Sequence, residues 1–406
     1  MNLTIDAATQ KRLGMIRGLG ESHIRPVGLE ADRLGRPVPH DHAFFQTLIE
    51  LGLGRTRWDG QAEAEDRLKQ ESANANAKAN VQTKVGASRG MLCVAEEMSY
   101  WDRGVAVAFP GPGLGDPPIS TMGTSEQKQR FLGPFLNPKR AIWGSFAMTE
   151  PSAGSDVAAI KTAARKDGDH WILNGAKSFA AHASRAEWIV VWATVDPTLG
   201  REGHRAFVVE RGTPGLGEFN IERKMGLKAY ESTSFTLRDC RVPAANLLGG
   251  EDYYARKAGF KGAMKSFNAT RPLVAIMAVG IGRAALDASI AFARENDLLG
   301  QTRVRDRLER TRRRLRAARL LCWHAAYLAD YGRPNIVEAS MAKAMAPQVA
   351  LEATILGMEL LGEIGGRGDH LIEKLFRDVK AMDIVEGTGQ IQRVVMARQL
   401  VQLPRE

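Results

Sequence analysis

The sequence predicts a mostly α-helical protein with a central β domain. Residues 1–145 carry apolar side chains at helical spacing, residues 146–251 carry short β-branched and aromatic runs between turn residues, and residues 252–406 return to helical spacing. This order argues against a Rossmann-type fold, in which strands and helices alternate throughout. We therefore expect three domains with these bounds.

Length, composition and charge limit the classes of protein to consider. The chain has 406 residues, of which 44% are hydrophobic, enough for two or three packed domains. No apolar run of membrane-spanning length and no secretory signal are evident, so we expect a soluble cytoplasmic protein without membrane association. Three widely spaced cysteines suggest neither a disulfide framework nor a metal site. The net charge of +10 favours anionic partners: nucleic acid, a lipid surface or a ligand with several phosphates.

In the first domain, residues 42–54 and 91–101 have helical periodicity. Between them, residues 59–84 are polar, and we expect an exposed loop or a surface helix there. The Gly/Pro-rich stretch FPGPGLGDPPI, residues 109–119, is expected to be a non-helical break, because proline and glycine are poor helix formers.

In the middle domain, short runs of β-branched and aromatic residues predict strands. Asn174-Gly175 is a strong hairpin-turn signal, so Phe179 should lie on the following strand, either filling the core, which is the commoner role, or forming the wall of a cofactor site. The stretch FAMTEPSAGSD, residues 146–156, should enter the domain as a loop. The predicted strands are residues 170–175, 188–196, 205–211 and 232–242.

In the last domain, residues 303–322 form an arginine-rich helix with one apolar stripe. The arginines could contact nucleic acid or form a solvated or subunit-facing surface. Asp306 and Glu309 lie at helical pairing distance from them, and no aromatic residue is present to stack on bases. A nucleic-acid partner is therefore disfavoured. The apolar stripe consists of Val304, Leu308, Leu315 and Cys322.

Two stretches are suited to chemistry. In residues 146–156, Thr149, Gly154 and Ser155 could present hydroxyls and backbone N–H groups to a heteroaromatic ring or a phosphate, or simply form a tight turn. In DIVEGTGQIQR, residues 383–393, Glu386 stands between apolar residues and a Gly-Thr-Gly turn, which is an unusual setting for a single carboxylate.

These motifs resemble the acyl-CoA dehydrogenase family, flavin-dependent enzymes that oxidise the α,β bond of an acyl thioester. AMTEPSAGSDVAA, GFKGAMKSFNATRPLVAIMAVGIGRAALDAS and EKLFRDVKAMDIVEGTGQIQR carry the resemblance, the last two to medium-chain members, and it runs from about residue 10 to the end. The family's fold has an N-terminal α domain, a middle β domain and a C-terminal four-helix bundle. The resemblance also implies FAD as cofactor, an acyl-CoA substrate in fatty acid metabolism, an electron-transfer flavoprotein as electron acceptor, and a homotetramer.

The resemblance implies that Glu386 is the general base, which removes the substrate's α-proton while the β-hydrogen leaves as hydride to flavin N5. Such a base needs an elevated pKa, which burial without a cation would supply. Its backbone N–H is implied to stabilise charge on the thioester carbonyl. Gly387 and Gly389 would allow close approach to a ligand. Some members place the base just before the arginine of the NATRP-like motif, but that residue is Thr270 here.

Further residues are assigned by the resemblance. Thr149 would bond the flavin's pyrimidine edge, Ser155 would lie near pantetheine and pyrophosphate, and Arg271 would lie near the CoA, unless it forms a structural ion pair. The expected FAD contacts are Phe146, Met148, Thr149, Ser155, Phe179, Ala181, Asn296, Arg307, Thr388 and Gln390. The expected substrate contacts are Ser155, Asn268, Arg271 and Gly387.

Beside the flavin, the chain departs from the family pattern. Phe179 replaces a tryptophan, Ala181 replaces the Thr or Ser whose hydroxyl donates to flavin N5, and His182 replaces an asparagine. The lost hydroxyl leaves open an oxidase or an eliminase on the same scaffold. Small residues in 104–113 and at Val385 would permit branched or cyclic acyl groups without fixing the chain length.

The segments that reach the neighbouring subunit's FAD also differ. Asn296 and Leu299 replace an arginine and a phenylalanine, and Arg307 replaces a glutamine. Glu359 and Glu363 replace a neutral amide and a glycine near the pyrophosphate. An acid there is unfavourable unless a cation compensates for it, and Arg307 could do so.

Overall fold

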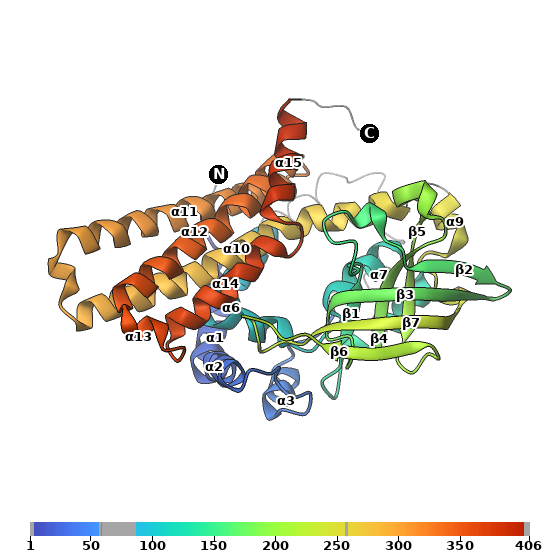
Figure 1. Cartoon of the computed structure of the whole chain (residues 1–406), viewed down its shortest axis with the longest axis horizontal. Helices are drawn as coiled ribbons and strands as arrows, with labels where there is room; N and C mark the ends of the chain where they lie inside the picture. The colour runs from blue at the N-terminus through green and yellow to red at the C-terminus, as the bar shows by residue number, and fades with distance from the viewer. Residues whose placement is uncertain (1–3, 57, 59–86, 256–258, 402–406) are drawn as a thin grey trace.

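The computed structural model describes residues 4–56, 58, 87–255 and 259–401, with only the helical backbone described over 259–269. Figure 1 shows the central sheet on one side of the molecule, the long C-terminal helices on the other, and α1 to α3 below them. The predicted class, mostly α with a central β domain, is confirmed. The expected loop or surface helix at 59–84 lies outside the described residues.

The N-terminal helices begin at residues that satisfy their free N–H groups. Asp6 accepts from the Thr9 N–H at 2.8 Å, and Thr124 forms a reciprocal capping box with Gln127. The helical segments before the sheet are α1 Ala7–Leu19, the π-helix η1 Gly20–Ile24, α2 Arg25–Leu34, α3 Ala43–Glu50, α6 Ala87–Ala108, η3 Gly113–Gly115, α7 Asp116–Met122, α8 Ser125–Leu132 and η4 Gly133–Phe135.

The expected break at 109–119 is only partly correct. Helix α7 begins inside it at Asp116, and two prolines occupy its first turn. Proline is tolerated there because the first N–H groups of a helix have no intrahelical acceptor. The prolines therefore start this helix instead of ending one.

The middle domain is a seven-stranded sheet in the order β1-β4-β2-β3-β7-β6, with β5 paired to β4. The four predicted strands correspond to β3, β4, β5 and β7, with 188–196 and 205–211 running two residues and one residue past the ends of β4 and β5. Phe146 and Ala147, expected in a loop, belong to β1, which pairs in parallel with β4. The strands are β1 Gly144–Ala147, β2 Ala163–Asp167, β3 His170–Ala181, β4 Trp188–Thr194, β5 His204–Glu210, β6 Leu216–Ile221 and β7 Ser232–Pro243.

The predicted hairpin turn at Asn174-Gly175 is wrong, because β3 continues through it. Asn174 instead bonds Asp239 across the sheet, and a Cβ on Gly175 would lie 2.5 Å from the Thr162 hydroxyl oxygen. The glycine therefore serves close packing, and the β2–β3 hairpin turns at Gly168, whose φ is +60°.

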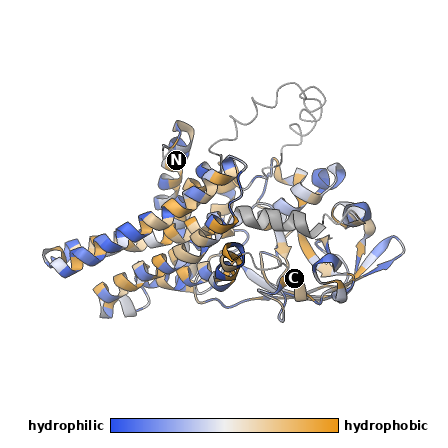
Figure 2. Ribbon diagram, turned by 90° about the horizontal axis from the view of Figure 1, so that it is seen from above, coloured by the Kyte–Doolittle hydropathy of each residue, from blue (hydrophilic) through white to orange (hydrophobic). Residues whose placement is uncertain are grey.

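The C-terminal domain is a helical bundle. Hydrophilic and hydrophobic residues alternate along its helices, as packing of amphipathic faces requires (Figure 2). Leu308, Leu315 and Cys322 of the predicted stripe are buried, and Val304 packs against them at the edge. The helices are α9 Gly250–Ala255, α10 Gly259–Glu295, η8 Leu298–Gly300, α11 Thr302–Asp330, α12 Ile336–Leu361, α13 Glu363–Gly366, α14 Leu371–Ile384 and α15 Gly389–Leu400.

Two bundle helices are long and apolar enough to span a membrane by length and composition, which the sequence analysis did not anticipate. They are α10 from Thr270 to Glu295 and α12. In α10, 72% of the most apolar window is buried inside the protein, and the two helices pack against each other. Their hydropathy is explained by a position in the core of the bundle.

A buried charge cluster joins three parts of the chain. The Lys374 ammonium lies 2.6 Å from Asp102 of α6 and 2.5 Å from Asp378 one turn further along α14. Asp378 also accepts the backbone N–H of Leu227, and Asp102 accepts that of Val105. Burial alone would lower the pKa of Lys374, but the two carboxylates hold it above its usual range.

We predict that Lys374→Met destabilises the protein by about 3–5 kcal/mol, because it leaves two carboxylates buried without their cation. Lys380→Met is the matched control, since Lys380 is exposed on the same helix. Chemical unfolding of both variants measures the difference. Equal stability of the two variants would show that the cluster does not hold these segments together.

Candidate active site

The turn between α14 and α15 presents Glu386. Its φ of +58° is uncommon for a residue with a side chain, and Gly387 follows at +92°. Thr388 caps α15 by accepting the Ile391 N–H, and the Gln392 amide donates to the carbonyl of Gly387 at 3.1 Å. These bonds hold the backbone in a conformation that Glu386 would not adopt alone.

The Glu386 carboxylate is partly buried and accepts a hydrogen bond from the Thr270 hydroxyl at 3.2 Å. Burial raises its pKa, while Thr270 and the charges of Arg103 and Lys343 oppose the rise. The net effect is a raised pKa for Glu386, as the sequence analysis expected of a general base. The expectation of burial without a cation is wrong, because two cations approach this carboxylate.

Lys343 is one of these cations, and it also positions the turn. It is fully buried in α12, and its ammonium donates to the Met382 carbonyl at 2.7 Å in the last turn of α14. Burial lowers its pKa to about 8, against the opposing charges of Asp383 and Glu386. A lone lysine in the apolar run ASMAKAMAPQVA was the available signal, and sequence reasoning missed it.

Arg103 is the second cation, also missed. Helix α6 is broken at Asp102, whose φ of −164° and ψ of 116° are extended, and the next turn restarts at Arg103. Burial lowers the pKa of Arg103 to about 10, while Tyr230, Glu386 and Asp102 oppose that shift. Among the described residues, its Nε atom has no hydrogen-bond partner.

Arg271 lies next to Thr270 on α10 and is buried. Its Nε and Nη1 atoms have no hydrogen-bond partner, and no ion pair joins it to any described residue. The alternative of a structural ion pair is therefore not supported, and the guanidinium is free for an anionic ligand. The side chain of Asn268, one turn earlier, lies outside the described residues.

In the β domain, a buried ion pair fixes the 146–156 loop. The Lys177 ammonium lies 2.8 Å from Glu150 and donates to the Met148 carbonyl at 3.1 Å. Burial lowers the pKa of Lys177 to about 8, with Glu150 opposing. The Thr149 carbonyl accepts the Ser178 N–H at 2.9 Å, so this loop and β3 are held together. Ser155 is exposed further along the loop.

Phe179 does not fill the core, the commoner role for such an aromatic. Its side chain is 68% exposed at a φ of +59°, directly after the residue that bonds the 146–156 loop. The Ala181 carbonyl accepts the Ser145 hydroxyl at 2.7 Å. The site therefore presents an uncovered aromatic face beside Thr149, as a planar ring ligand would require.

His182 is buried directly after the end of β3, on a left-handed backbone with a φ of +62°. Its Nε2 donates to the Val107 carbonyl at 2.9 Å, and burial lowers its pKa to about 4, so the ring is neutral. Tyr230 packs edge-on against it at 6.2 Å. Tyr230 and Arg103 influence each other electrostatically, and Arg103 and Glu386 do the same.

Two further predicted FAD contacts, Asn296 and Arg307, lie far from the other predicted contacts within one chain. Asn296 and Arg307 belong to the end of the bundle where α10 passes into α11, opposite the end that carries α15 (Figure 1). Arg307 forms an ion pair with Glu359, as the sequence analysis proposed for charge compensation, and Glu363 pairs with Arg367 at 3.2 Å.

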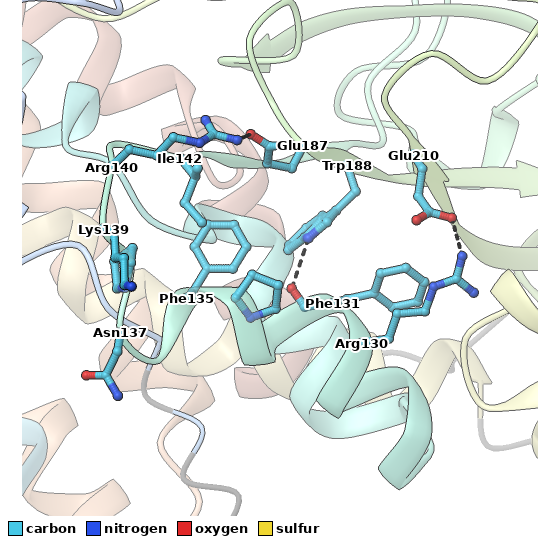
Figure 3. Close-up of a pocket in the computed structure, with 12 residues that line it drawn as sticks. Arg130, Phe131, Phe135, Asn137, Lys139, Arg140, Ile142, Glu187, Trp188 and Glu210 are labelled. Carbon is cyan, nitrogen blue, oxygen red and sulfur yellow. Dashed lines mark hydrogen bonds and ion pairs between the residues drawn. The ribbon is translucent and has the colours of Figure 1, made fainter.

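A pocket of about 600 Å³ lies elsewhere, between α8 and the ends of β4 and β5 (Figure 3). None of the predicted site residues lines it. Four of its charged side chains form the ion pairs Arg140–Glu187 and Arg130–Glu210, at 2.9 and 2.5 Å. We therefore place the candidate site at the Glu386 turn.

The residues at the Glu386 turn and the β domain fit a large anionic flavin cofactor. Phe179 offers an uncovered ring, Arg271 an unpartnered buried cation, and Thr388 begins a helix whose N-terminus favours phosphate. Among the described residues, no group of three or more His, Cys, Asp or Glu could hold a metal ion. Gln390 is exposed in the first turn of α15.

Comparison with known proteins agrees with this geometry. Family models match residues 145–240 (acyl-CoA dehydrogenase, middle domain) and 257–401 (acyl-CoA dehydrogenase, C-terminal domain). A probable acyl-CoA dehydrogenase of Mycobacterium tuberculosis is 36% identical over 78% of this chain and 81% of its own length. An acryloyl-CoA reductase (NADH) of Anaerotignum propionicum is 38% identical over 70% of this chain and 72% of its own.

Among solved structures, butyryl-CoA dehydrogenase from Megasphaera elsdenii aligns with a TM-score of 0.83 at 28% identity, covering 99% of this chain and all of its own. The family models cover the middle and C-terminal parts of the chain, and the shared fold covers nearly all of it. The chain therefore belongs to the acyl-CoA dehydrogenase family of FAD-binding oxidoreductases.

Proposed function

We propose that the protein oxidises an acyl-CoA to its trans-2-enoyl-CoA, with Glu386 as the base and flavin N5 as the hydride acceptor. The observation that carries this proposal is a single carboxylate with a raised pKa, held by Thr270 on a strained turn beside an unpartnered Arg271. FAD, when bound, supplies a two-electron acceptor for the hydride that leaves the β-carbon.

The proton step falls to Glu386. An α-proton of a thioester is weakly acidic, so a carboxylate with a raised pKa is a better acceptor than an ordinary one. A proton moves from the substrate's α-carbon to Glu386 Oε, and the backbone N–H of the same residue would stabilise charge on the thioester carbonyl. The Thr270 hydroxyl fixes the orientation of the carboxylate during this step.

Binding of the anionic groups falls to other residues. Arg271 and the N-terminus of α15 would take phosphates of CoA and FAD, with Gly387 allowing close approach. Phe179 and Thr149 would hold the flavin ring, whose surroundings would include the remaining β-domain positions. Those positions are Phe146, Met148, Ser155 and Ala181.

A homotetramer would complete the cofactor site. Asn296 and Arg307 lie at the far end of the bundle, so their proposed contact with FAD needs a neighbouring subunit.

We also propose an electron-transfer flavoprotein as electron acceptor, a cytoplasmic location and a role in fatty acid metabolism. In the arginine-rich helix, Arg314 pairs with Glu352 and Arg319 with Glu96, which supports the solvated or subunit-facing alternative over nucleic-acid binding.

A second outcome on the same scaffold, an oxidase or eliminase, is favoured by one observation. Ala181 carries no hydroxyl to donate to flavin N5, and the neighbouring Ser145 hydroxyl is used by the Ala181 carbonyl. Oxygen consumption during turnover would indicate an oxidase, and release of a leaving group from the β-carbon to give the enoyl product without flavin reduction would indicate an eliminase.

Glu386→Gln should keep acyl-CoA and FAD binding but slow flavin reduction by about three or more orders of magnitude, near the upper range for loss of a general base. Anaerobic mixing with a panel of acyl-CoAs measures this. Glu352→Gln, an exposed acid on α12, is the control and should reduce at the wild-type rate. Reduction of the Glu386→Gln flavin at that same rate would contradict the assignment of the base.

Thr270→Val should move the acid limb of the rate–pH profile to higher pH. The hydroxyl stabilises the charged carboxylate, so removing it raises the pKa of Glu386 further, and the base then stays protonated and inactive to a higher pH. One hydrogen bond corresponds to about 0.4–1 pH unit. Thr236→Val, which removes a similar hydroxyl bonded to Glu218 in the sheet, should leave the profile in place.

Phe179→Ala should weaken FAD retention by about twofold to tenfold, the range for one lost stacking contact, without changing the stability of the apoprotein. The stability is unaffected because the side chain is 68% exposed. Equilibrium dialysis of FAD and thermal unfolding of the apoprotein measure the two effects. Leu199→Ala, at another exposed apolar side chain, is the control. Unchanged FAD retention would place the ring elsewhere.

A further inference from the structure

Arg103, like Arg271, has a guanidinium that no carboxylate among the described residues matches, and Arg271 is already assigned above to the phosphates of CoA and FAD. Arg185 pairs with Glu231 at 2.9 Å, and Arg283 pairs with Glu96 at 2.8 Å. For Arg103, the structure records no hydrogen bond and no ion pair with any described residue. Its side chain is partly buried and its Nε has no partner, and such an unsatisfied charged group is costly unless an anion binds it.

The acid next to Arg103 in the sequence is not available as that anion. Both oxygens of Asp102 are engaged, one by the Val105 N–H at 2.8 Å and the other by the Lys374 ammonium at 2.6 Å. The remaining charged neighbour is Glu386, with the Tyr230 ring on another side. The guanidinium forms no ion pair with Glu386, but its charge acts on this carboxylate, which is the proposed base.

This position has opposite consequences for two kinds of acyl group. A hydrocarbon tail would cover an unpaired guanidinium and leave its positive charge acting on Glu386, which lowers the pKa of the base. An acyl group ending in a carboxylate would bind Arg103 with charge-assisted hydrogen bonds and cancel that charge. Substrate binding would then strengthen the base.

We propose that the site takes an acyl-CoA whose acyl group ends in a carboxylate, and that Arg103 binds this carboxylate. The proposal rests on the function proposed above and names its substrate class. Tyr230 is a positioning residue in this arrangement, because its ring packs against that of His182 and its hydroxyl and the Arg103 guanidinium influence each other electrostatically. The buried Lys374–Asp102 pair holds the helix break from which Arg103 extends.

The test compares CoA thioesters of equal carbon number with and without a terminal carboxylate: succinyl with butyryl, glutaryl with pentanoyl, and adipyl with hexanoyl. Anaerobic flavin reduction by the FAD-loaded wild type should be about tenfold or more faster, at limiting substrate, for at least one dicarboxylic member than for its partner. In Arg103→Gln this preference should disappear, and reduction by the monocarboxylic partner should rise. Arg103→Lys, which keeps the charge without the bidentate fork, should retain part of the preference.

Arg140→Gln is the control, because Arg140 pairs with Glu187 at the separate pocket, and it should keep the full preference. Calorimetric binding of glutaryl-CoA and pentanoyl-CoA to the Glu386→Gln protein gives a readout that needs no turnover. Binding there should favour glutaryl-CoA, and Arg103→Gln added to that background should remove the difference.

The outcomes separate the two proposals. Rapid reduction by monocarboxylic thioesters with no dicarboxylic preference, unaltered in Arg103→Gln, overturns the role of Arg103 and leaves the dehydrogenase proposal intact. If no thioester reduces the flavin, the dehydrogenase proposal fails, and the binding preference in the Glu386→Gln background still decides the inference. Equal binding of glutaryl-CoA and pentanoyl-CoA in that background overturns it.

Discussion

The buried Lys374 ammonium, held between Asp102 and Asp378, is the interaction on which the geometry of the site depends. It joins α6 to α14, and through the Leu227 N–H it also joins the segment between β6 and β7. Any of these charges alone would be expensive to bury, so the segments must meet in one arrangement. Arg103 follows directly from one end of this cluster, and Glu386 follows α14 from the other.

The electrostatics of Glu386 are a balance between burial and nearby cations. Burial favours the neutral acid, whereas Thr270, Arg103 and Lys343 favour the carboxylate. Lys343 is committed to the Met382 carbonyl, so its position is fixed by the fold. Arg103 makes no such hydrogen bond, so a bound ligand can change how strongly its charge lowers the pKa of Glu386. The pKa of Glu386 is therefore set partly by the protein and partly by the ligand bound next to it.

Much of the fold was readable from sequence because it rests on local patterns. The change from helical to strand periodicity located the sheet, and the EGTG turn singled out Glu386. The errors arose where distant residues overrule local preference: Gly175 serves packing against Thr162 instead of a turn, and Phe179 is held outward on a left-handed backbone. Arg103 could not be recognised because its importance comes from a carboxylate 283 positions later in the chain, and from the one beside it being used by Lys374.

The departures from the family pattern fall into two groups with different physical meaning. At the far end of the bundle, Glu359 and Glu363 gain arginine partners within the same chain, so the change in charge is compensated locally. The other group lies beside the expected flavin position, where a hydroxyl is missing at position 181, and toward the Glu386 turn Arg103 has no hydrogen-bond or ion-pair partner among the described residues. A substituted charge that gains an ion-pair partner in the same chain leaves the fold unchanged. A buried charge without a partner is stabilised only when a ligand binds it. The chemistry specific to this chain is therefore concentrated where α6 meets the base, and not where subunits would meet.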